Sequence, residues 1–233
     1  DFQNNLQEYL NVRHVIPCAN GTDALQIALM ALDLKRGDEI ITTNFSFAST
    51  IEVILLLGLK PVVIDIDPKS FNINPSLIQD KITERTKNVI SGLGFNEVVT
   101  DSIVGDSQDR HGTIWSETGG LKILNPIRQD ENLLRKALVH NLLRVKKHNQ
   151  NYGVEKTDIY ELSKVYLPKE DDQLPEEKEC LCVLGENGYL ALKGVIEAIL
   201  RHLNIEENLE SAHFDFGLFS SEKSAELRLG NSV

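Results

Sequence analysis

The sequence changes character near Ile90 and Ser91, and this change constrains what the chain can fold into. Before it, short apolar segments alternate with helical ones, as at the start of an α/β domain. After it, the strand-like segments are longer and alternate apolar with polar side chains, which is typical of a half-exposed antiparallel sheet. The sequence therefore predicts two domains of different fold class, residues 1–90 and residues 91–233.

The composition is that of a folded, acidic protein, with 41% hydrophobic and 25% charged residues and a net charge of −11. An acidic surface repels phosphate backbones, so we expect no direct nucleic-acid partner. A basic cluster at Arg144, Lys146, Lys147 and His148 has helical spacing, and we interpret it as a solvated helix face. No apolar run approaches the roughly 20 residues of a membrane span, so we expect no membrane partner either.

Three cysteines, Cys18, Cys180 and Cys182, are too few for a disulfide framework, and we expect a reduced, cytoplasmic protein. Cys180 and Cys182 share one face of a predicted strand. No further residues of ligand type stand close to them in the sequence. We therefore predict small buried side chains and no metal site.

Residues 1–90 predict a parallel α/β arrangement. The expected order is strand, helix, strand, helix, strand, at 15–20, 22–34, 37–43, 47–58 and 61–67. This order implies parallel strands with right-handed crossovers. Both helices are apolar on nearly all sides, as expected of helices covered by protein. Gly58 suits a left-handed cap at the end of the second.

The chemistry of this part lies at the start of the first helix, in Asn20-Gly21-Thr22-Asp23. Gly21 permits a tight turn, and the N–H groups at the helix start form an anion site together with the Thr22 hydroxyl. The same residue types are also common as simple helix caps. The residues alone leave phosphate binding and capping both open.

The run ANGTDALQIALMALDLKRGDEIITTNFSFASTIEVILLLGLKPVVIDIDPKSFNIN resembles the early large domain of the DegT/DnrJ-type sugar aminotransferases. The resemblance covers essentially all of residues 1–90. It implies an aspartate-aminotransferase-like fold with pyridoxal phosphate as cofactor. It assigns the cofactor phosphate to Gly21, Thr22 and the backbone of Asp23, and the pyridine ring to Phe47. From the residues alone, Phe47 can equally be a core aromatic.

The reactive residues of that family are missing. The family needs an Asp that keeps the pyridine nitrogen protonated and a Lys that forms the internal aldimine, in motifs resembling EDxAQ and a Ser-rich segment ending in Lys. Neither motif follows residue 90, and the nearest similar run, EDDQ at 170–173, lies in a polar loop. We therefore predict no catalytic residues and no transamination.

Residues 91–233 predict an α+β domain with an antiparallel sheet. The expected strands are 95–104, 121–127, 157–167 and 179–185, followed by short terminal strands in HFDFGLF and AELRLG. The expected helices are 131–150, capped by Asp130, and 190–204.

The helix at 131–150 is expected to carry an apolar stripe, since Leu134, Leu138 and Leu142 are spaced four apart. Arg135 lies beside this stripe. There its guanidinium can bridge to a carboxylate or a strand-end carbonyl, or it can be solvated.

Five runs in this part resemble the synthetase-like core of the phenylalanyl-tRNA synthetase beta subunit. They are LGFNEVVTDSIV, LKILNPIRQDENLLRKALVHNLLRVKKHNQ, DIYELSKVYLP, LALKGVIEAILRHL and SAELRLG. The family usually has Met-Arg-x-Ser-Leu-Leu-Pro-Gly around its central helix. Here Arg135 is kept, whereas His140-Asn141 replaces the Pro-Gly step and favours a continuous helix.

That beta core is a degenerate copy of the class II synthetase fold, and in the family the adenylate chemistry belongs to the alpha subunit. The resemblance thus implies a non-catalytic module that supports synthetase assembly through contacts with an alpha-subunit-like partner. The histidines agree with this, since they show no nucleophile or metal-ligand spacing; they are His111, His140, His148, His202 and His213.

The helix expected at 76–90 fits the sequences on both sides of the junction, and no flexible tether separates the two parts. The sequence leaves open whether the chain is a fused gene fragment, a recombinant chimera or an artefact of sequence assembly. It also leaves three functions open: the synthetase beta-core module, which we favour, a pyridoxal-phosphate-binding fragment, and a chimera without native function. A homo-oligomer is a further open alternative.

Overall fold

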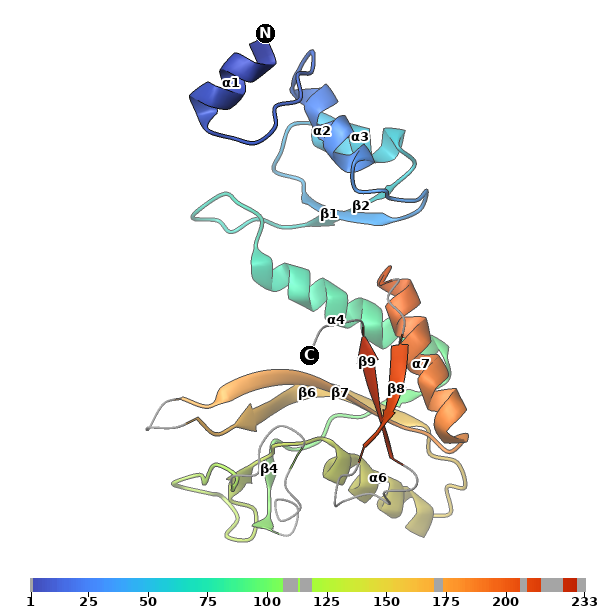
Figure 1. Cartoon of the computed structure of the whole chain (residues 1–233). Helices are drawn as coiled ribbons and strands as arrows, with labels where there is room; N and C mark the ends of the chain where they lie inside the picture. Colours follow the sequence, from blue (N-terminus) through green and yellow to red (C-terminus); the bar gives the residue numbers. More distant parts are fainter. Residues whose placement is uncertain are drawn as a thin grey trace. The chain divides into compact units, whose positions relative to one another are not determined.

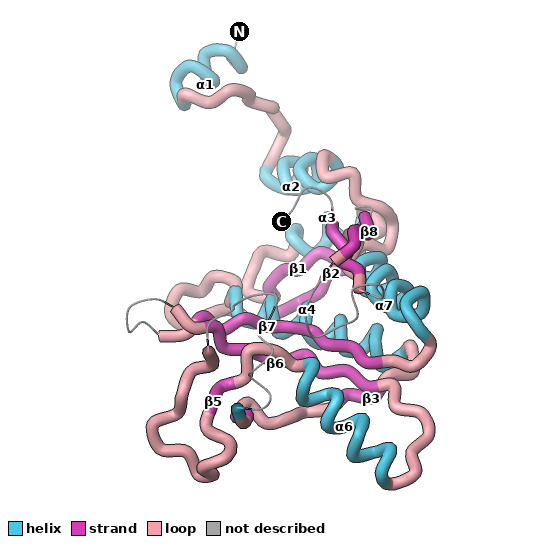
Figure 2. Tube along the Cα trace, turned by 60° about the horizontal axis from the view of Figure 1, so that its bottom comes forward, coloured by secondary structure: helices cyan, strands magenta, loops and turns pink. Residues whose placement is uncertain are grey.

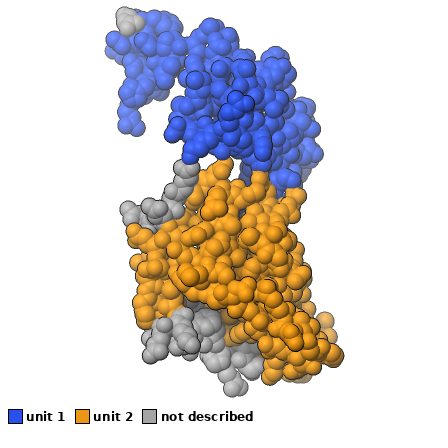
Figure 3. Space-filling model, turned by 90° about the vertical axis from the view of Figure 1, so that its right-hand side faces the viewer, with its two compact units in different colours: residues 1–82 blue, residues 83–233 orange. Residues whose placement is uncertain are grey.

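The computed structural model describes residues 2–106, 113, 119–169, 174–205, 209–214 and 224–229. The chain divides into two compact units, residues 1–82 and residues 83–233 (Figure 3). The division falls inside the helix α4 (Pro75–Gly92), and so does the junction that the sequence predicts after residue 90. A helix at 76–90 is thereby confirmed.

Unit 1 contains two parallel strands joined by a helix (Figure 1). β1 (Glu39–Thr43) pairs with β2 (Lys60–Ile64) along its whole length, and α3 (Ser49–Leu56) connects them. The parallel pairing that the strand–helix–strand order predicts is confirmed. Two further helices, α1 (Phe2–Leu10) and α2 (Gly21–Met30), precede this motif.

Gly58 ends α3 in the way the sequence predicts. Its φ angle is +74°, in the left-handed region that favours glycine. The Gly58 N–H donates to the Leu55 carbonyl at 2.9 Å, and the Leu59 N–H donates to the Ile54 carbonyl at 3.0 Å. These two bonds make a Schellman motif, which satisfies carbonyls at the helix end and turns the chain into β2.

The strand predicted at 15–20 is wrong, since this segment pairs with no described strand and its side chains are mostly exposed. Pro17 stands in its middle and has no N–H to contribute to a ladder. The apolar residues Val15 and Ile16 are too few to hold a strand by burial alone.

The two apolar helices of unit 1 are less covered than their composition predicts. α2 has no buried residue, and Met30 is 61% exposed. On α3, Val53 and Ile54 are buried, but Leu56 is 71% exposed. Helices this apolar normally need a full sheet on one side and a further layer on the other. The described residues of unit 1 supply only two strands.

Unit 2 is built on a three-stranded sheet with helices on both faces (Figures 1 and 2). The strand order is β3-β6-β7, formed by Asn96–Glu97, Ile159–Leu167 and Glu176–Leu184. α6 (Val139–Asn151) lies on one face, and α4 and α7 (Gly188–His202) lie on the other.

The two core clusters on these faces differ in composition. Under α6, Leu138 and Leu142 pack against Ile159, Val165 and Leu167 of β6. On the opposite face, Tyr160 packs against Ile90 of α4 and Val195 of α7. The alternation of β6 side chains between the two clusters is the period of two that strand geometry imposes.

The sheet is only partly antiparallel. β6 and β7 pair antiparallel, as predicted, but β3 runs parallel to β6. The single strand predicted at 95–104 is also wrong, because it divides into β3 and β4 (Ile103–Val104). Between them the polar groups of Thr100 bond to side chains instead of to a neighbouring strand.

The helix predicted at 131–150 begins only at Val139, so the first part of this prediction is wrong. Leu133 and Leu134 form β5, which pairs antiparallel with β4. The Arg135 N–H donates to the Ser102 carbonyl at 2.9 Å, and the Arg135 carbonyl accepts from the Tyr166 N–H at 3.0 Å. These cross-strand bonds require extended backbone. Asp130 therefore caps no helix, and Leu134, Leu138 and Leu142 form no continuous helical stripe.

The segment 121–127 and the two C-terminal strands differ in how far they agree with the sequence. The strand predicted at 121–127 is wrong, since only Lys122 forms an isolated bridge there. The two terminal strands form an antiparallel pair of β8 (Leu209–His213) and β9 (Ala225–Leu229), and the part of HFDFGLF from residue 215 lies outside the described residues.

None of the helices in the described ranges is long and apolar enough to cross a membrane.

Leu142 and Leu143 offer a matched test of the α6 face, because Leu142 is fully buried and Leu143 is 41% exposed. We expect Leu142→Ala to lower the free energy of unfolding of unit 2 by about 2–5 kcal/mol, through lost burial and a residual cavity. We expect Leu143→Ala to change it by less than about 1 kcal/mol. Urea unfolding followed by circular dichroism measures both. Equal effects would contradict the packing of α6 on the sheet.

Candidate functional site

The predicted anion site of unit 1 is formed as a helix cap. Asn20 is the N-cap of α2, and its Oδ1 accepts from the Asp23 N–H at 2.9 Å. Its Nδ2 donates to the Asp23 carboxylate at 3.1 Å, so the two residues bond reciprocally. The N–H of Asp23, which the resemblance assigns to a phosphate, already has a partner within the chain.

Gly21 and Phe47 are both open to ligands. A Cβ built on Gly21 meets no atom within 4 Å, so the space beside this residue is free. Phe47 is 80% exposed, so it contributes nothing to the core of the described residues. Phe45 and Phe71, which the sequence did not single out, form an aromatic pair whose rings stack with centroids 5.5 Å apart.

These residues suit the phosphate and the ring face of pyridoxal phosphate, but no residue is identified for its pyridine nitrogen or its aldehyde. Gly21 and Thr22 at the start of α2 can accommodate a phosphate, and Phe47 can accommodate a ring. The motifs that would carry the Asp for the pyridine nitrogen and the Lys for the aldimine do not occur in the sequence. EDDQ at 170–173 lies outside the described residues. The roles of Gly21, Thr22, Asp23 and Phe47 stay predictions.

In unit 2, Arg135 and Glu161 form an ion pair in which both side chains are buried. The Arg135 Nη1 lies 2.8 Å from the Glu161 Oε1. Arg135 is 3% exposed and Glu161 is fully buried on β6. Of the alternatives that the sequence left open for Arg135, the contact with a carboxylate is therefore confirmed, and the solvated arginine is wrong.

Both members of the pair have further partners. The Arg135 Nε donates to the Lys164 carbonyl at 3.1 Å, and its Nη1 donates to the Thr100 carbonyl at 3.1 Å. Glu161 accepts from the Thr100 N–H at 3.2 Å and from the Thr100 hydroxyl at 2.7 Å. A buried ion pair is tolerated only when such bonds satisfy its remaining donors and acceptors.

The sequence did not single out Glu161 or Thr100. A signal was present, since Glu161 stands between apolar residues at an inward position of a strand, where a charge needs a buried partner. This cluster therefore has a structural role. The acid and the base of this cluster are held by each other and by backbone groups, so the cluster fastens segments of unit 2 together.

The cysteine pair of β7 lies on the α6 face of the sheet, where Cys180 and Cys182 pack against the core. Burial raises the pKa of the Cys182 thiol to about 12, and the Glu161 carboxylate opposite it on β6 adds to this shift. A thiol with such a pKa is a poor nucleophile and a poor metal ligand at neutral pH. In the ranges that the structure describes, no cluster of three or more His, Cys, Asp or Glu side chains can hold a metal ion.

Comparison with known families identifies unit 2. Residues 71–233 match the family model of the phenylalanyl tRNA synthetase beta chain CLM domain. The chain belongs to this family. Its solved structural neighbours include the pyrrolysyl tRNA synthetase of Desulfitobacterium hafniense, with a TM-score of 0.52, 19% identity, and coverage of 68% of this chain and 56% of that one. This likeness shows a synthetase-like fold.

A second family matches the N-terminal part, since residues 1–92 match the DegT/DnrJ/EryC1/StrS aminotransferase family. The two matched ranges overlap in residues 71–92, which contain α4. Both resemblances that the sequence suggests are thereby confirmed.

The curated relatives of this part are much longer than the matched segment. The chain is 47% identical over 90 residues to the UDP-2-acetamido-2-deoxy-3-oxo-D-glucuronate aminotransferase of Pseudomonas aeruginosa, which covers 39% of this chain and 25% of that protein. It is 38% identical over 113 residues to a pleiotropic regulatory protein of Geobacillus stearothermophilus, covering 48% and 30%. The chain thus spans a quarter to a third of the length of these relatives.

The buried ion pair yields a prediction about stability. Because Arg135→Met leaves the Glu161 charge buried without its partner, we expect it to lower the free energy of unfolding of unit 2 by about 3–5 kcal/mol. Lys164→Met is the control, since it breaks the pair of Lys164 with Glu177, in which both side chains are more than half exposed. We expect a change of at most about 1 kcal/mol for that variant.

The double variant Arg135→Met/Glu161→Leu removes both charges and should be more stable than Arg135→Met alone. Chemical unfolding of the three variants measures these differences. A double variant that is less stable than Arg135→Met would show that the ion pair is not the reason for the loss.

Proposed function

We propose that this chain acts through unit 2 as a non-catalytic synthetase beta-core module, which supports phenylalanyl-tRNA synthetase assembly by binding an alpha-subunit-like partner. The observation that carries the proposal is the match of residues 71–233 to the phenylalanyl tRNA synthetase beta chain CLM domain. The Arg135–Glu161 cluster supports it, because its charges lie on the α6 face of the sheet and bond to one another and to backbone carbonyls. Charged groups in this arrangement stabilise a scaffold. They present neither a nucleophile nor an open acid–base pair to a substrate.

The packing of the sheet supports the same function. Its two faces are covered by helices of the chain itself, with Leu142 under α6 and Tyr160 under α4. The Tyr160 hydroxyl is also satisfied, by the Ser91 hydroxyl at 2.9 Å and the Lys87 carbonyl at 3.3 Å. Binding by this module is therefore expected on the outer surfaces of the helices and on the strand edges.

The partner is a phenylalanyl-tRNA synthetase alpha subunit, and mixing it with the full chain tests the proposal. We expect a complex that elutes earlier than either protein in size-exclusion chromatography, with a mass by light scattering that contains both chains. A sugar aminotransferase of the N-terminal family is the control partner and should give no complex. Separate elution of the chain and the alpha subunit at micromolar concentrations would refute the proposal. The same light-scattering measurement on the chain alone decides between a monomer and a homo-oligomer.

A second candidate function is pyridoxal-phosphate binding by unit 1 without catalysis. The free space beside Gly21 at the start of α2 and the exposed ring of Phe47 favour it. On either proposal the chain is a fusion of two family fragments, and its three free cysteines suit the cytoplasm.

The second candidate predicts a visible absorption change when the full chain is incubated with pyridoxal phosphate. Gly21→Val should abolish the change, because its side chain fills the space beside the helix start. Thr83→Val, in unit 2, should leave it intact. We expect no transamination of a keto-sugar nucleotide with glutamate, since the aldimine lysine motif is missing. Turnover together with a borohydride-trapped lysine adduct would contradict this expectation.

A further inference from the structure

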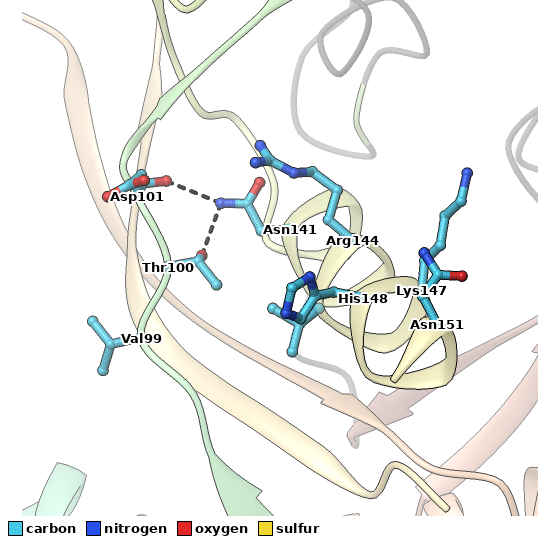
Figure 4. A pocket seen from close by; sticks show the side chains of 9 residues that line it. Val99, Thr100, Asp101, Asn141, Arg144, Lys147, His148 and Asn151 are labelled. Atoms are coloured by element: carbon cyan, nitrogen blue, oxygen red, sulfur yellow. Dashed lines mark hydrogen bonds between the residues drawn. The ribbon is translucent and has the colours of Figure 1, made fainter. Parts of the chain in front are cut away.

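A pocket of about 490 Å³ opens between the segment 99–101 and one side of α6 (Figure 4). Its α6 wall is basic, with Arg144, Lys147 and His148 at helical spacing. In a chain with a net charge of −11, such a wall is a local exception. These residues belong to the basic cluster that we interpreted from the sequence as a solvated helix face. In the structure they line the same pocket.

The floor of the pocket holds a buried acceptor, the Asn141 Oδ1, that has no hydrogen-bond partner among the described residues. Asn141 is 4% exposed, and its Nδ2 donates to the Thr100 hydroxyl at 2.8 Å and to the Asp101 carbonyl at 2.9 Å. A carbonyl can only accept, so these bonds fix which end of the amide is the nitrogen. The Oδ1 is buried, and no described residue donates to it. Figure 4 shows it on the side of Arg144, away from Thr100 and Asp101. A ligand with an N–H group would satisfy it.

The opposite wall is the backbone of segment 99–101, which follows β3 and belongs to no strand. The N–H groups of Val98 and Thr100 point inward, to the Tyr160 carbonyl at 2.8 Å and the Glu161 carboxylate at 3.2 Å. By the same alternation of neighbouring residues, the backbone groups of Val99 point outward. They have no hydrogen-bond partner among the described residues, and the Val99 side chain is 84% exposed.

We propose that this pocket binds an extended acidic peptide segment of a partner protein. Its backbone pairs with the exposed backbone groups of Val99, and one of its N–H groups donates to the Asn141 Oδ1. Its carboxylates lie against Lys147 and against Arg144, whose Nη1 is 3.8 Å from the Glu131 carboxylate. Asn141 and Asn151 are ten residues apart along α6, about 15 Å, which matches four or five residues of extended chain.

The chemistry of the two walls selects a peptide over other anions. Inorganic phosphate would use the cations, but its dianion has a single O–H and so could not donate both to the Asn141 Oδ1 and to the Val99 carbonyl. A nucleic acid would have to approach a chain of net charge −11 along its whole length. The inference goes beyond the proposed function, because it concerns a peptide of any partner and does not need the alpha subunit.

The test uses fluorescence anisotropy of a labelled six-residue peptide of alternating Glu and Val, added to the full chain. We expect saturable binding that Lys147→Ala weakens by about tenfold, since one charge-assisted contact is lost. Lys146→Ala is the matched control. It lies on the same helix, but its amine pairs with Glu186 at 3.0 Å and it does not line the pocket. We expect it to leave the affinity unchanged.

Two further measurements bear on the peptide itself and on the acceptor. The peptide with Gln in place of Glu should bind at least about tenfold more weakly. In an NMR titration with the Glu peptide, the Asn141 side-chain amide signals should shift. Equal loss for Lys147→Ala and Lys146→Ala, unchanged Asn141 signals, or tighter binding of inorganic phosphate or single-stranded RNA than of the peptide would overturn the proposal.

Discussion

The ion pair between Arg135 and Glu161 is the interaction on which unit 2 depends most. Its charges are buried on the α6 face of β6, where neither could stand alone without a large loss of solvation. Thr100 bonds to both members, and the Lys164 carbonyl accepts from the guanidinium. The pair thus fixes the segment before β4, the segment after β5 and the middle of β6 in one arrangement. A shift in register of any of them would break several bonds at once, so the pair contributes specificity as well as stability.

The same interaction explains where the sequence was a good guide and where it was not. β6, β7 and α7 were predictable because each is a local pattern: a period of two, or a long apolar stripe. The start of α6 was not, because Leu133 to Lys136 have the helical spacing of the residues that follow them. What makes them extended is distant in sequence, namely the Ser102 carbonyl and the Tyr166 N–H. Long-range bonds of this kind override local propensity and leave no trace in a short window.

Unit 1 illustrates a different limit. Its parallel pair and the cap at Gly58 follow from local rules, and both were predictable. The predicted site residues Gly21, Thr22, Asp23 and Phe47 all lie in the described part of the chain. The Asn20–Asp23 bonds form a helix cap, and Phe47 is exposed. The side chains of α2 and α3 stay largely uncovered, because the described residues of unit 1 supply only two strands for them to pack on.

The cap at the start of α2 has a consequence for any anion that binds there. Because the Asp23 N–H already donates to the Asn20 Oδ1, an incoming anion that uses this donor must displace an existing acceptor. The helix would then exchange one cap for another, and the net gain would be the difference between two similar bonds. The Asp23 carboxylate beside the exchange point also repels a negative charge. The Asn20 side chain and an incoming anion therefore compete for the same N–H group. Removing the Asn20 side chain would favour the anion and would also destabilise the helix without a ligand.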